Sequence, residues 1–223
     1  MPLSIIPDLT IEARFWRAGL TYLAGLDEAG RGAWAGPVTA AAVIFRADET
    51  LPQRLSGVRD SKLMTPCQRS YWADKIKQEA LTWGVGMASW EEIDALGILN
   101  ATRLAMQRAL EQLIITPQQL LLDALRLPEI PLPQEAIIKG DRRSLSIAAA
   151  SVLAKTSRDA WMIACDQNFP GYGFAHHKGY GTFAHKQALG TLGPCPIHRR
   201  TFSPIARLKT RCRHKRRHLE VKT

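Results

Sequence analysis

Cysteine is scarce in this sequence and never follows a metal-binding or disulfide pattern. The four cysteines are far apart and form no C-x-x-C pair, which argues against a zinc ribbon and a disulfide framework. The longest stretch without a charged residue, Gly32 to Phe45, is well below the roughly 20 residues that a membrane helix needs. The first twenty residues also lack the pattern of a secretory signal. We therefore expect a cytoplasmic protein with reduced thiols and no membrane span.

Acidic residues are almost missing from the C-terminal quarter of the chain. Residues 1–166 hold 18 Lys or Arg and 19 Asp or Glu, whereas residues 167–223 hold 12 and 1, so the formal charge of +10 lies at the C-terminal end. All six histidines lie there too and would add positive potential when protonated. This local excess favours a polyanionic partner, with nucleic acid ahead of a membrane surface. A solvated tail without a partner is the alternative.

The rest of the composition is typical of a globular protein, with 46% hydrophobic and 22% charged residues. The apolar runs Tyr22–Leu26 and Val38–Phe45 predict strands, and so does the stretch Trp83–Trp90. An S-x-x-E capping box at Ser89 opens a predicted helix. An alanine-rich run from Ser144 predicts a second helix that can pack closely on a sheet. Because strands and helices alternate, the expected class is α/β with a mixed sheet.

Several of the apolar runs end in carboxylates. Asp27 and Glu28 follow the first run, and Asp123 and Asp141 each follow a later one. Because strand ends from distant positions meet at one edge of an α/β sheet, the four acids can share a cleft. Asp27 and Glu28 are sequence neighbours, so they can both do so only if the strand ends between them.

Four carboxylates in one cleft require a cation. At about 4 Å and an effective dielectric constant near 20, each like-charged pair costs roughly 4 kcal/mol. Hard divalent ions suit oxygen ligands, and no Cys and His set suggests zinc. Two such ions would activate a water and stabilise the leaving oxygen of a phosphodiester. A glycosidase that uses two of the acids is an alternative enzyme, but it leaves the basic excess unexplained.

Three further features suit a substrate. Gly30, Arg31 and Gly32 form a turn whose backbone N–H groups allow close approach of a phosphate. The spacing is neither a Walker motif nor G-x-G-x-x-G, so a nucleotide-binding fold is not indicated. Tyr180 lies between glycines that leave its ring exposed, which suits stacking on a sugar or base, although tyrosines pack on turns equally often. Lys62 lies in a polar loop and by itself is an ordinary surface lysine.

A series of short motifs runs in order from about residue 21 to 205. They are 27–32 (DEAGRG), 36–38 (GPV), 60–62 (DSK), 139–141 (KGD), 146–151 (SIAAAS), 154–155 (AK), 158–159 (RD), 177–182 (HKGYGT) and 197–199 (IHR). Two of them, DEAGRG and KGD, are specific, and the whole series resembles the ribonuclease HII family of bacteria.

The resemblance implies an RNase H-like fold, a mixed central sheet flanked by helices, with a helical and basic C-terminal segment. Residues 1–20 are then an N-terminal extension, residues 21–206 the catalytic domain and residues 207–223 a basic tail. The implied activity is that of a monomeric endoribonuclease. It hydrolyses the RNA strand of RNA–DNA hybrids and nicks duplex DNA on the 5′ side of a single embedded ribonucleotide. The products end in 3′-hydroxyl and 5′-phosphate groups.

The resemblance also implies roles for individual residues. The catalytic acids and ligands of Mg²⁺ or Mn²⁺ are Asp27, Glu28, Asp123 and Asp141. The residues that recognise the ribose 2′-hydroxyl, which distinguishes RNA from DNA, are Gly30, Arg31, Gly32 and Tyr180. Lys62 is expected to contact a backbone phosphate.

One position departs from the family pattern. The family usually has Asp-Gly-Asn at the third acid, whereas Asp123 is followed here by Ala124 and Leu125. This departure concerns the local loop geometry rather than metal binding. A non-catalytic basic protein that binds RNA or hybrids is the alternative function. The four acids favour the enzyme, because a pure binder has no use for an anionic cleft that faces phosphates.

Overall fold

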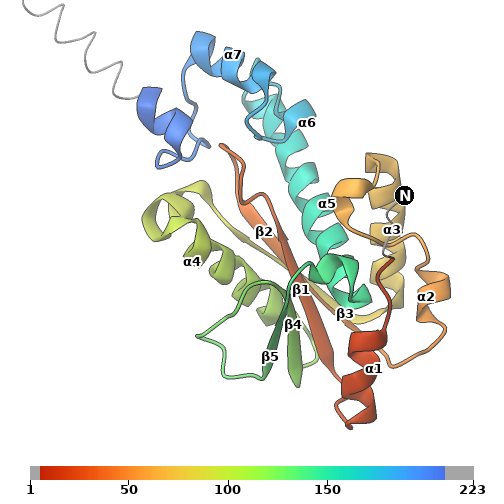
Figure 1. The fold of residues 1–223 in the computed structure, drawn as a ribbon. Helices are drawn as coiled ribbons and strands as arrows, with labels where there is room; N and C mark the ends of the chain where they lie inside the picture. The colour runs from red at the N-terminus through yellow and green to blue at the C-terminus, as the bar shows by residue number, and fades with distance from the viewer. Residues whose placement is uncertain (1–5, 209–223) are drawn as a thin grey trace, which may run out of the picture.

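A five-stranded sheet with helices on both faces forms the centre of the protein (Figure 1). The structure, a computed structural model, describes residues 6–208. Its elements are α1 (Thr10–Arg17), β1 (Leu23–Ala29), β2 (Val38–Phe45), α2 (Leu51–Arg54), η1 (Ser61–Leu63), α3 (Pro66–Glu79), β3 (Ala80–Ala88), α4 (Trp90–Glu111), β4 (Gln119–Asp123), β5 (Gln134–Ile137), η2 (Gly140–Arg142), α5 (Leu145–Asn168), α6 (Phe174–His177) and α7 (Phe183–Leu192). The predicted α/β class with a mixed sheet is confirmed.

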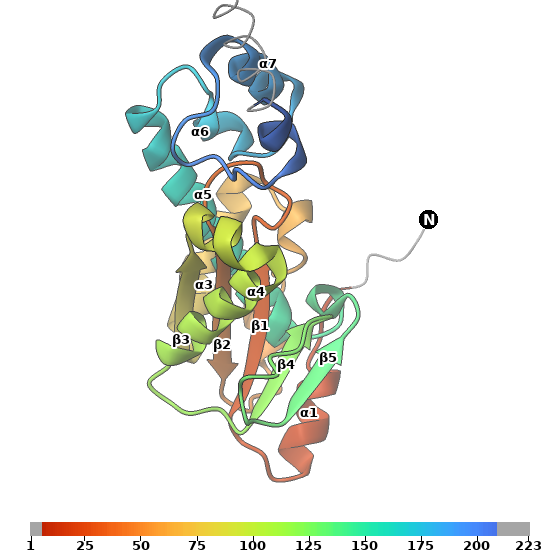
Figure 2. The ribbon, with the colours of Figure 1, turned by 90° about the vertical axis from the view of Figure 1, so that its left-hand side faces the viewer.

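The strands lie in the order β3-β2-β1-β4-β5. Strand β2 is antiparallel to both of its neighbours, whereas β1, β4 and β5 run parallel. Figure 2 shows the strands side by side, with α4 in front of them and α3 and α5 behind. In the parallel pair Leu26 lies opposite Leu122, so the residues that follow them, Asp27 and Asp123, reach the same edge of the sheet.

Strand β2 explains how the sheet can be covered on both faces. Ala41 and Val43 belong to the core that packs against α5, whereas Ala40 and Ala42 belong to the core that packs against α4. A strand buried on both sides is expected to be a continuous apolar run rather than an alternating one. The predicted close approach of the alanine-rich helix is confirmed, since a Cβ atom added at Gly25 would lie 2.3 Å from the backbone of Ser146.

Both predicted helix starts are confirmed. Ser89 and Glu92 form the reciprocal capping box that opens α4, and the Ser144 hydroxyl caps α5 by accepting the Ile147 N–H at 3.2 Å. Helix α4 is not regular throughout, because Gly97 has φ 76° and separates two helical segments. Glycine tolerates this positive φ.

The structure decides two points about the acids that the sequence left open. Strand β1 does not end between Asp27 and Glu28 but continues to Ala29, because it stays paired with β2 up to Thr39. The apolar run that precedes Asp141 does not form a strand that reaches this acid. Strand β5 ends at Ile137, and Asp141 lies on the separate short helix η2.

Helix α1 lies within the predicted N-terminal extension and packs on the core. Its Glu12 is buried, accepting hydrogen bonds from the Ser144 hydroxyl at 2.6 Å and the Ser146 N–H at 2.9 Å. Most of the predicted tail, residues 209–223, lies outside the described residues, together with His214 and His218. Between residues 6 and 208 no helix is long and apolar enough to cross a membrane.

Candidate active site

Three carboxylates meet at the edge of the sheet where β1 and β4 run parallel. Asp27 and Asp123 come from these two strands and Asp141 comes from η2. Each offers an oxygen atom, and the three oxygens lie within 4.8 Å of one another. Asp123 Oδ1 also accepts the Gly140 N–H at 2.8 Å. This hydrogen bond ties η2 to the end of β4 and so brings Asp141 to the other two acids.

The electrostatics of this cluster favour a cation. Burial raises the pKa of Asp27 well above its usual range, and the neighbouring charge of Glu28 raises it further. Burial also raises the pKa of Asp141, and the charges of Asp60 and Asp123 raise it to a smaller extent. Buried like charges of this kind are stable only when a positive partner compensates them. Oxygen ligands suit a hard divalent ion, so the three acids can hold one.

Glu28 lies beside this group rather than within it. Its Oε1 accepts a hydrogen bond from Arg31 at 3.0 Å, while Oε2 is buried and has no hydrogen-bond partner among residues 6–208. Burial raises the pKa of Glu28 although the hydrogen bond from Arg31 opposes the shift. Its predicted role as a metal ligand stays a prediction, and the free buried oxygen is compatible with it.

A cavity of about 490 Å³ lies beside the acids, because its lining includes Glu28 and also Lys62, whose pKa is raised by the clustered aspartates. It is lined by all five predicted substrate-binding residues and by Glu28, and further by Ala29 and three polar residues for which the sequence predicted no role. The predicted residues are Gly30, Arg31, Gly32, Lys62 and Tyr180, and the additional polar ones are Ser61, Arg69 and Lys155. The sheet edge and the motif from residue 177 onward thus form one site.

The two glycines of the turn are needed for different reasons. Gly30 has φ 94°, and a Cβ atom added there would lie 2.0 Å from Arg158 Nε, so only glycine fits. A Cβ atom at Gly32 would meet nothing within 4 Å. Gly32 therefore borders open space, and its lack of a side chain leaves the turn accessible to a ligand.

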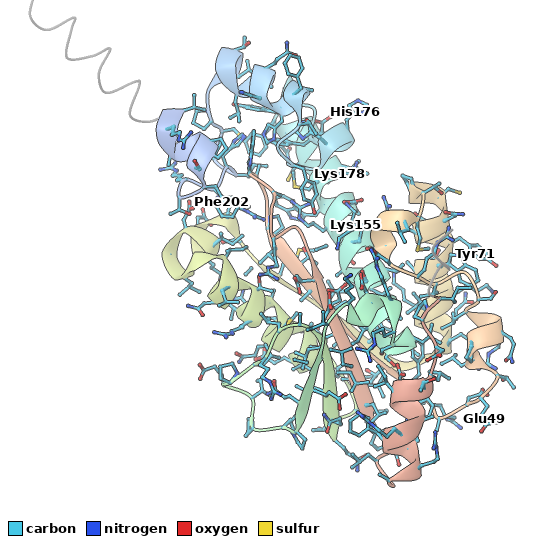
Figure 3. All side chains as sticks on the ribbon, viewed as in Figure 1. Glu49, Tyr71, Lys155, His176, Lys178 and Phe202 are labelled. Atoms are coloured by element: carbon cyan, nitrogen blue, oxygen red, sulfur yellow. The ribbon has the colours of Figure 1, made fainter. Side chains whose placement is uncertain are left out.

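Tyr180 is less exposed than its flanking glycines predict. The residue is half-buried, and two cations lie over its ring, Lys155 Nζ at 5.4 Å and Arg158 Cζ at 5.2 Å from the ring centre. Lys155 projects from the middle of α5 (Figure 3) and also pairs with Asp159 at 2.6 Å. These contacts cover part of the ring, so of the two interpretations that the sequence left open the packed tyrosine is favoured over the freely exposed one.

Lys62 is exposed and lies close to the acids. Burial lowers the pKa of its ammonium group, but the carboxylates of Asp60, Asp27, Asp141 and Asp123, in this order, raise it, and the net shift is upward. The amine is therefore charged at neutral pH and available to an anion. Asp60 itself is buried and pairs with Arg142 at 3.1 Å.

Part of the basic C-terminal excess is not on the surface, contrary to the simplest interpretation of the charge. Arg199 is fully buried and donates hydrogen bonds to backbone carbonyls around the glycine turn. They are Gly30 at 2.7 Å, Arg31 at 2.9 Å, Gly36 at 3.0 Å and Pro37 at 3.0 Å. The histidines differ from expectation too, because burial lowers the pKa of His177, His185 and His198 and keeps these rings neutral. Of these residues, His198 and Arg199 lie in the 197–199 motif and His177 lies in the 177–182 motif, and the motifs gave them no role.

Comparison with known proteins identifies the family. The ribonuclease HII profile matches residues 24–205. The ribonuclease HII of Chloroflexus aurantiacus is 53% identical over 202 residues, which cover 90% of this chain and 95% of the relative. That of a strain of Thermus thermophilus is 50% identical over 201 residues, with 90% and 95% covered. The chain belongs to the ribonuclease HII family.

Solved structures agree with this assignment. The crystal structure of ribonuclease H2 from Pyrococcus horikoshii matches this structure with a TM-score of 0.70 at 28% sequence identity. The match covers 86% of this chain and 99% of the Pyrococcus chain. A chain of the PCNA:RNase HII complex from Archaeoglobus fulgidus has a TM-score of 0.70 at 25% identity, with 83% and 96% covered. The predicted RNase H-like fold is confirmed. As a ribonuclease HII, the chain is a metal-dependent endoribonuclease that acts on RNA–DNA hybrids, which excludes the glycosidase and the non-catalytic binder.

The departure from the ribonuclease HII pattern at Ala124 takes the form of backbone strain. Ala124 has φ 54°, the left-handed conformation that favours glycine, and its N–H donates to the Ile137 carbonyl at 3.1 Å.

We expect Ala124→Gly to raise the free energy of unfolding by about 0.5–1 kcal/mol. Relief of the backbone strain at this position is worth about 1–2 kcal/mol, which exceeds the entropic cost of ordering a glycine on folding. Urea denaturation measures this. Ala47→Gly, at an exposed position without positive φ, is the control and should lower stability; the same sign for both variants would contradict the assignment of strain.

Proposed function

We propose that the chain cleaves the phosphodiester bond on the 5′ side of a ribonucleotide, both in RNA–DNA hybrids and where a single ribonucleotide is embedded in duplex DNA. The products carry 3′-hydroxyl and 5′-phosphate ends. The observation that carries this proposal is that the acid cluster adjoins the cavity lined by the glycine turn and Tyr180. Groups suited to breaking a phosphodiester and groups suited to a ribose therefore lie next to each other.

The acid cluster fits divalent ions. Three carboxylate oxygens lie within 4.8 Å of one another, and Glu28 Oε2 is buried without a partner among the residues that the structure describes. Asp27, Asp123 and Asp141, joined by Glu28, would hold Mg²⁺ or Mn²⁺. The chemistry supplied by such ions is activation of the attacking water and stabilisation of the leaving 3′ oxygen.

The chain's own residues would orient the substrate. The Gly30–Arg31–Gly32 turn borders open space at Gly32, so its backbone can approach the sugar and exchange hydrogen bonds with a 2′-hydroxyl. Tyr180 would contact the ribose with its ring, which Lys155 and Arg158 hold in position. A deoxyribose would leave these polar groups unpaired, which is the strongest basis for discrimination.

Lys62 would bind a backbone phosphate beside the acids. Its charge is retained because the neighbouring carboxylates raise its pKa, and its exposed ammonium group reaches solvent. A contact of this kind positions the duplex without reading sequence.

We further propose that the chain acts as a monomer in the cytoplasm. The acids and the cavity come from a single chain, and Cys67, Cys165 and Cys195 are free thiols.

Three duplexes of identical sequence test the proposed specificity. One is all DNA, one carries a single ribonucleotide, and one carries a 2′-deoxy-2′-fluoro nucleotide at that position. With Mg²⁺ or Mn²⁺, the ribonucleotide duplex should be nicked on the 5′ side of the ribonucleotide. Its kcat/KM should exceed that of the other two duplexes by about 10⁴-fold, since a site built to hydrogen-bond a hydroxyl rejects analogues that lack it. Extension of the nicked strand by a polymerase reports the 3′-hydroxyl end. Equal cleavage of the three duplexes would refute recognition of the 2′-hydroxyl.

A further inference from the structure

Three histidines form a buried cluster behind the loop that carries Tyr180. The rings of His177 and His185 stack with centres 4.3 Å apart, and His185 Nε2 lies 3.0 Å from His198 Nε2. The side chains of His185 and His198 are fully buried. Neither the acid cluster nor the cavity contains any of the three residues.

The hydrogen bonds define one direction through His198 and His185. His198 Nδ1 lies 2.9 Å from the Cys195 N–H and 3.3 Å from the Cys195 carbonyl oxygen. The N–H contact is the shorter one, and an N–H can only donate, so we assign Nδ1 as the acceptor without a proton. His198 Nε2 therefore carries it and donates to His185 Nε2. His185 must then hold its own proton on Nδ1, which lies 3.0 Å from the Tyr180 carbonyl oxygen and donates to it. The sequence of donors thus runs from Cys195 through both imidazoles to the backbone of Tyr180.

The surroundings keep both imidazoles neutral, as this arrangement requires. The pKa of His185 and of His198 is lowered to about 4, mainly by burial, and the neighbouring His185 contributes to the shift of His198. The titratable groups that face the pair are His177, Cys195 and Tyr172. A second proton on either ring would oppose an N–H with another N–H and break the series of hydrogen bonds.

The same loop is tied to the glycine turn. The Trp34 N–H donates to the Gly179 carbonyl at 2.8 Å, and a Cβ atom added at Gly181 would lie 2.2 Å from the Trp34 ring. The Trp34 ring in turn lies 5.4 Å from the ring of His185. Trp34 closely follows the turn of Gly30 and Gly32, so the histidine pair supports the point where the two sides of the cavity are joined.

We infer that His198 and His185 are positioning residues that hold the backbone of Tyr180, and with it the ring, in register with the glycine turn. The inference deepens the proposed function and rests on the role of Tyr180 in it. Neither histidine lines the substrate cavity, so any effect on cleavage is indirect, and the double-mutant comparison below tests whether it passes through Tyr180.

The first test reads the proton positions directly and does not depend on the substrate. Long-range ¹H–¹⁵N spectra of the full chain at pH 7 assign the tautomer of each histidine. We expect a neutral His185 with its proton on Nδ1 and a neutral His198 with its proton on Nε2. A His185 protonated on Nε2, or a charged ring at either position, would overturn the inference.

The second test changes His198, which does not contact Tyr180. His198→Leu removes the donor to His185, and we expect kcat/KM on the single-ribonucleotide duplex to fall about tenfold or more, since small misplacements of reacting groups are costly. His198→Gln can still donate through its amide and should stay within about threefold of the unchanged chain. His176→Leu is the matched control, because His176 is an exposed histidine at the outer side of α6 (Figure 3) and should leave kcat/KM unchanged.

A double-mutant comparison separates positioning from general loss of structure. His198→Leu should have no further effect when added to Tyr180→Ala, because the residue to be positioned is gone. An equal fall in both backgrounds would overturn the positioning role. Tyr180→Ala without any effect would instead refute the proposed role of Tyr180, whereas an effect of Tyr180→Ala with none of His198→Leu would refute the inference alone.

Discussion

Asp123→Asn is expected to slow hydrolysis of an RNA–DNA hybrid by at least about a thousandfold while leaving the affinity for the hybrid nearly unchanged. Asparagine keeps the oxygen that accepts the Gly140 N–H, so η2 stays attached to β4. It removes one of the three negative ligands from the cluster, and with it several kcal/mol of metal-dependent stabilisation, of which each 1.36 kcal/mol is a factor of ten. Turnover with Mg²⁺ or Mn²⁺ and fluorescence anisotropy without metal measure the two quantities.

The matched control for Asp123→Asn is Asp74→Asn, which makes the same change of charge at an exposed position of α3. It should retain full turnover. Asp141→Asn should behave like Asp123→Asn, since both supply oxygens to the same cluster. Unchanged turnover in these two cluster variants would mean that the acids do not carry the reaction.

Local signals in the sequence were sufficient for much of the fold. The capping box at Ser89 depends only on residues three apart, and the structure forms it. The apolar run Val38–Phe45 predicts a strand because it is short and continuously apolar, as a strand buried on both faces is, and β2 is buried at every residue. The small residues from Ser144 onward predict close packing, and α5 lies directly against Gly25.

The details of the acid site depend on contacts between distant residues and could not be predicted locally. Strand β1 extends past Asp27 because Ala29 pairs with Thr39 of β2. Asp141 leaves the strand direction because the N–H of Gly140 bonds to Asp123, which is 17 residues away in the sequence. Neither contact has a signal within a short window. That carboxylates gather at the sheet edge was predictable, whereas which of them share one cluster was not.

The C-terminal charge illustrates the same limit. A count of lysines and arginines cannot distinguish an exposed cation from one that binds backbone carbonyls inside the protein. Arg199 is of the second kind, and the rings of His185 and His198 are buried and neutral, so they carry no positive charge. The described part of this region, residues 167–208, therefore contributes to the active site in part by shaping the glycine turn and the Tyr180 loop.

Arg199→Lys is expected to lower the free energy of unfolding by about 3 kcal/mol or more although it preserves the charge. The planar guanidinium group spans four carbonyls, with Nε on Gly36, Nη1 on Arg31 and Nη2 on Gly30 and Pro37. A lysine places its donors on one nitrogen and cannot span this set. Each carbonyl left buried without a partner costs about 1–3 kcal/mol. Guanidinium chloride denaturation measures the loss.

The control is Arg200→Lys, the same substitution at the exposed neighbouring residue, which should change stability by less than about 0.5 kcal/mol. Activity gives a second readout, because the carbonyls of Gly30 and Arg31 belong to the turn that lines the cavity. Arg199→Lys should therefore reduce cleavage of the single-ribonucleotide duplex even at temperatures where the variant is folded. A variant as stable and active as Arg200→Lys would show that the charge of Arg199, rather than the geometry of its hydrogen bonds, supports the turn.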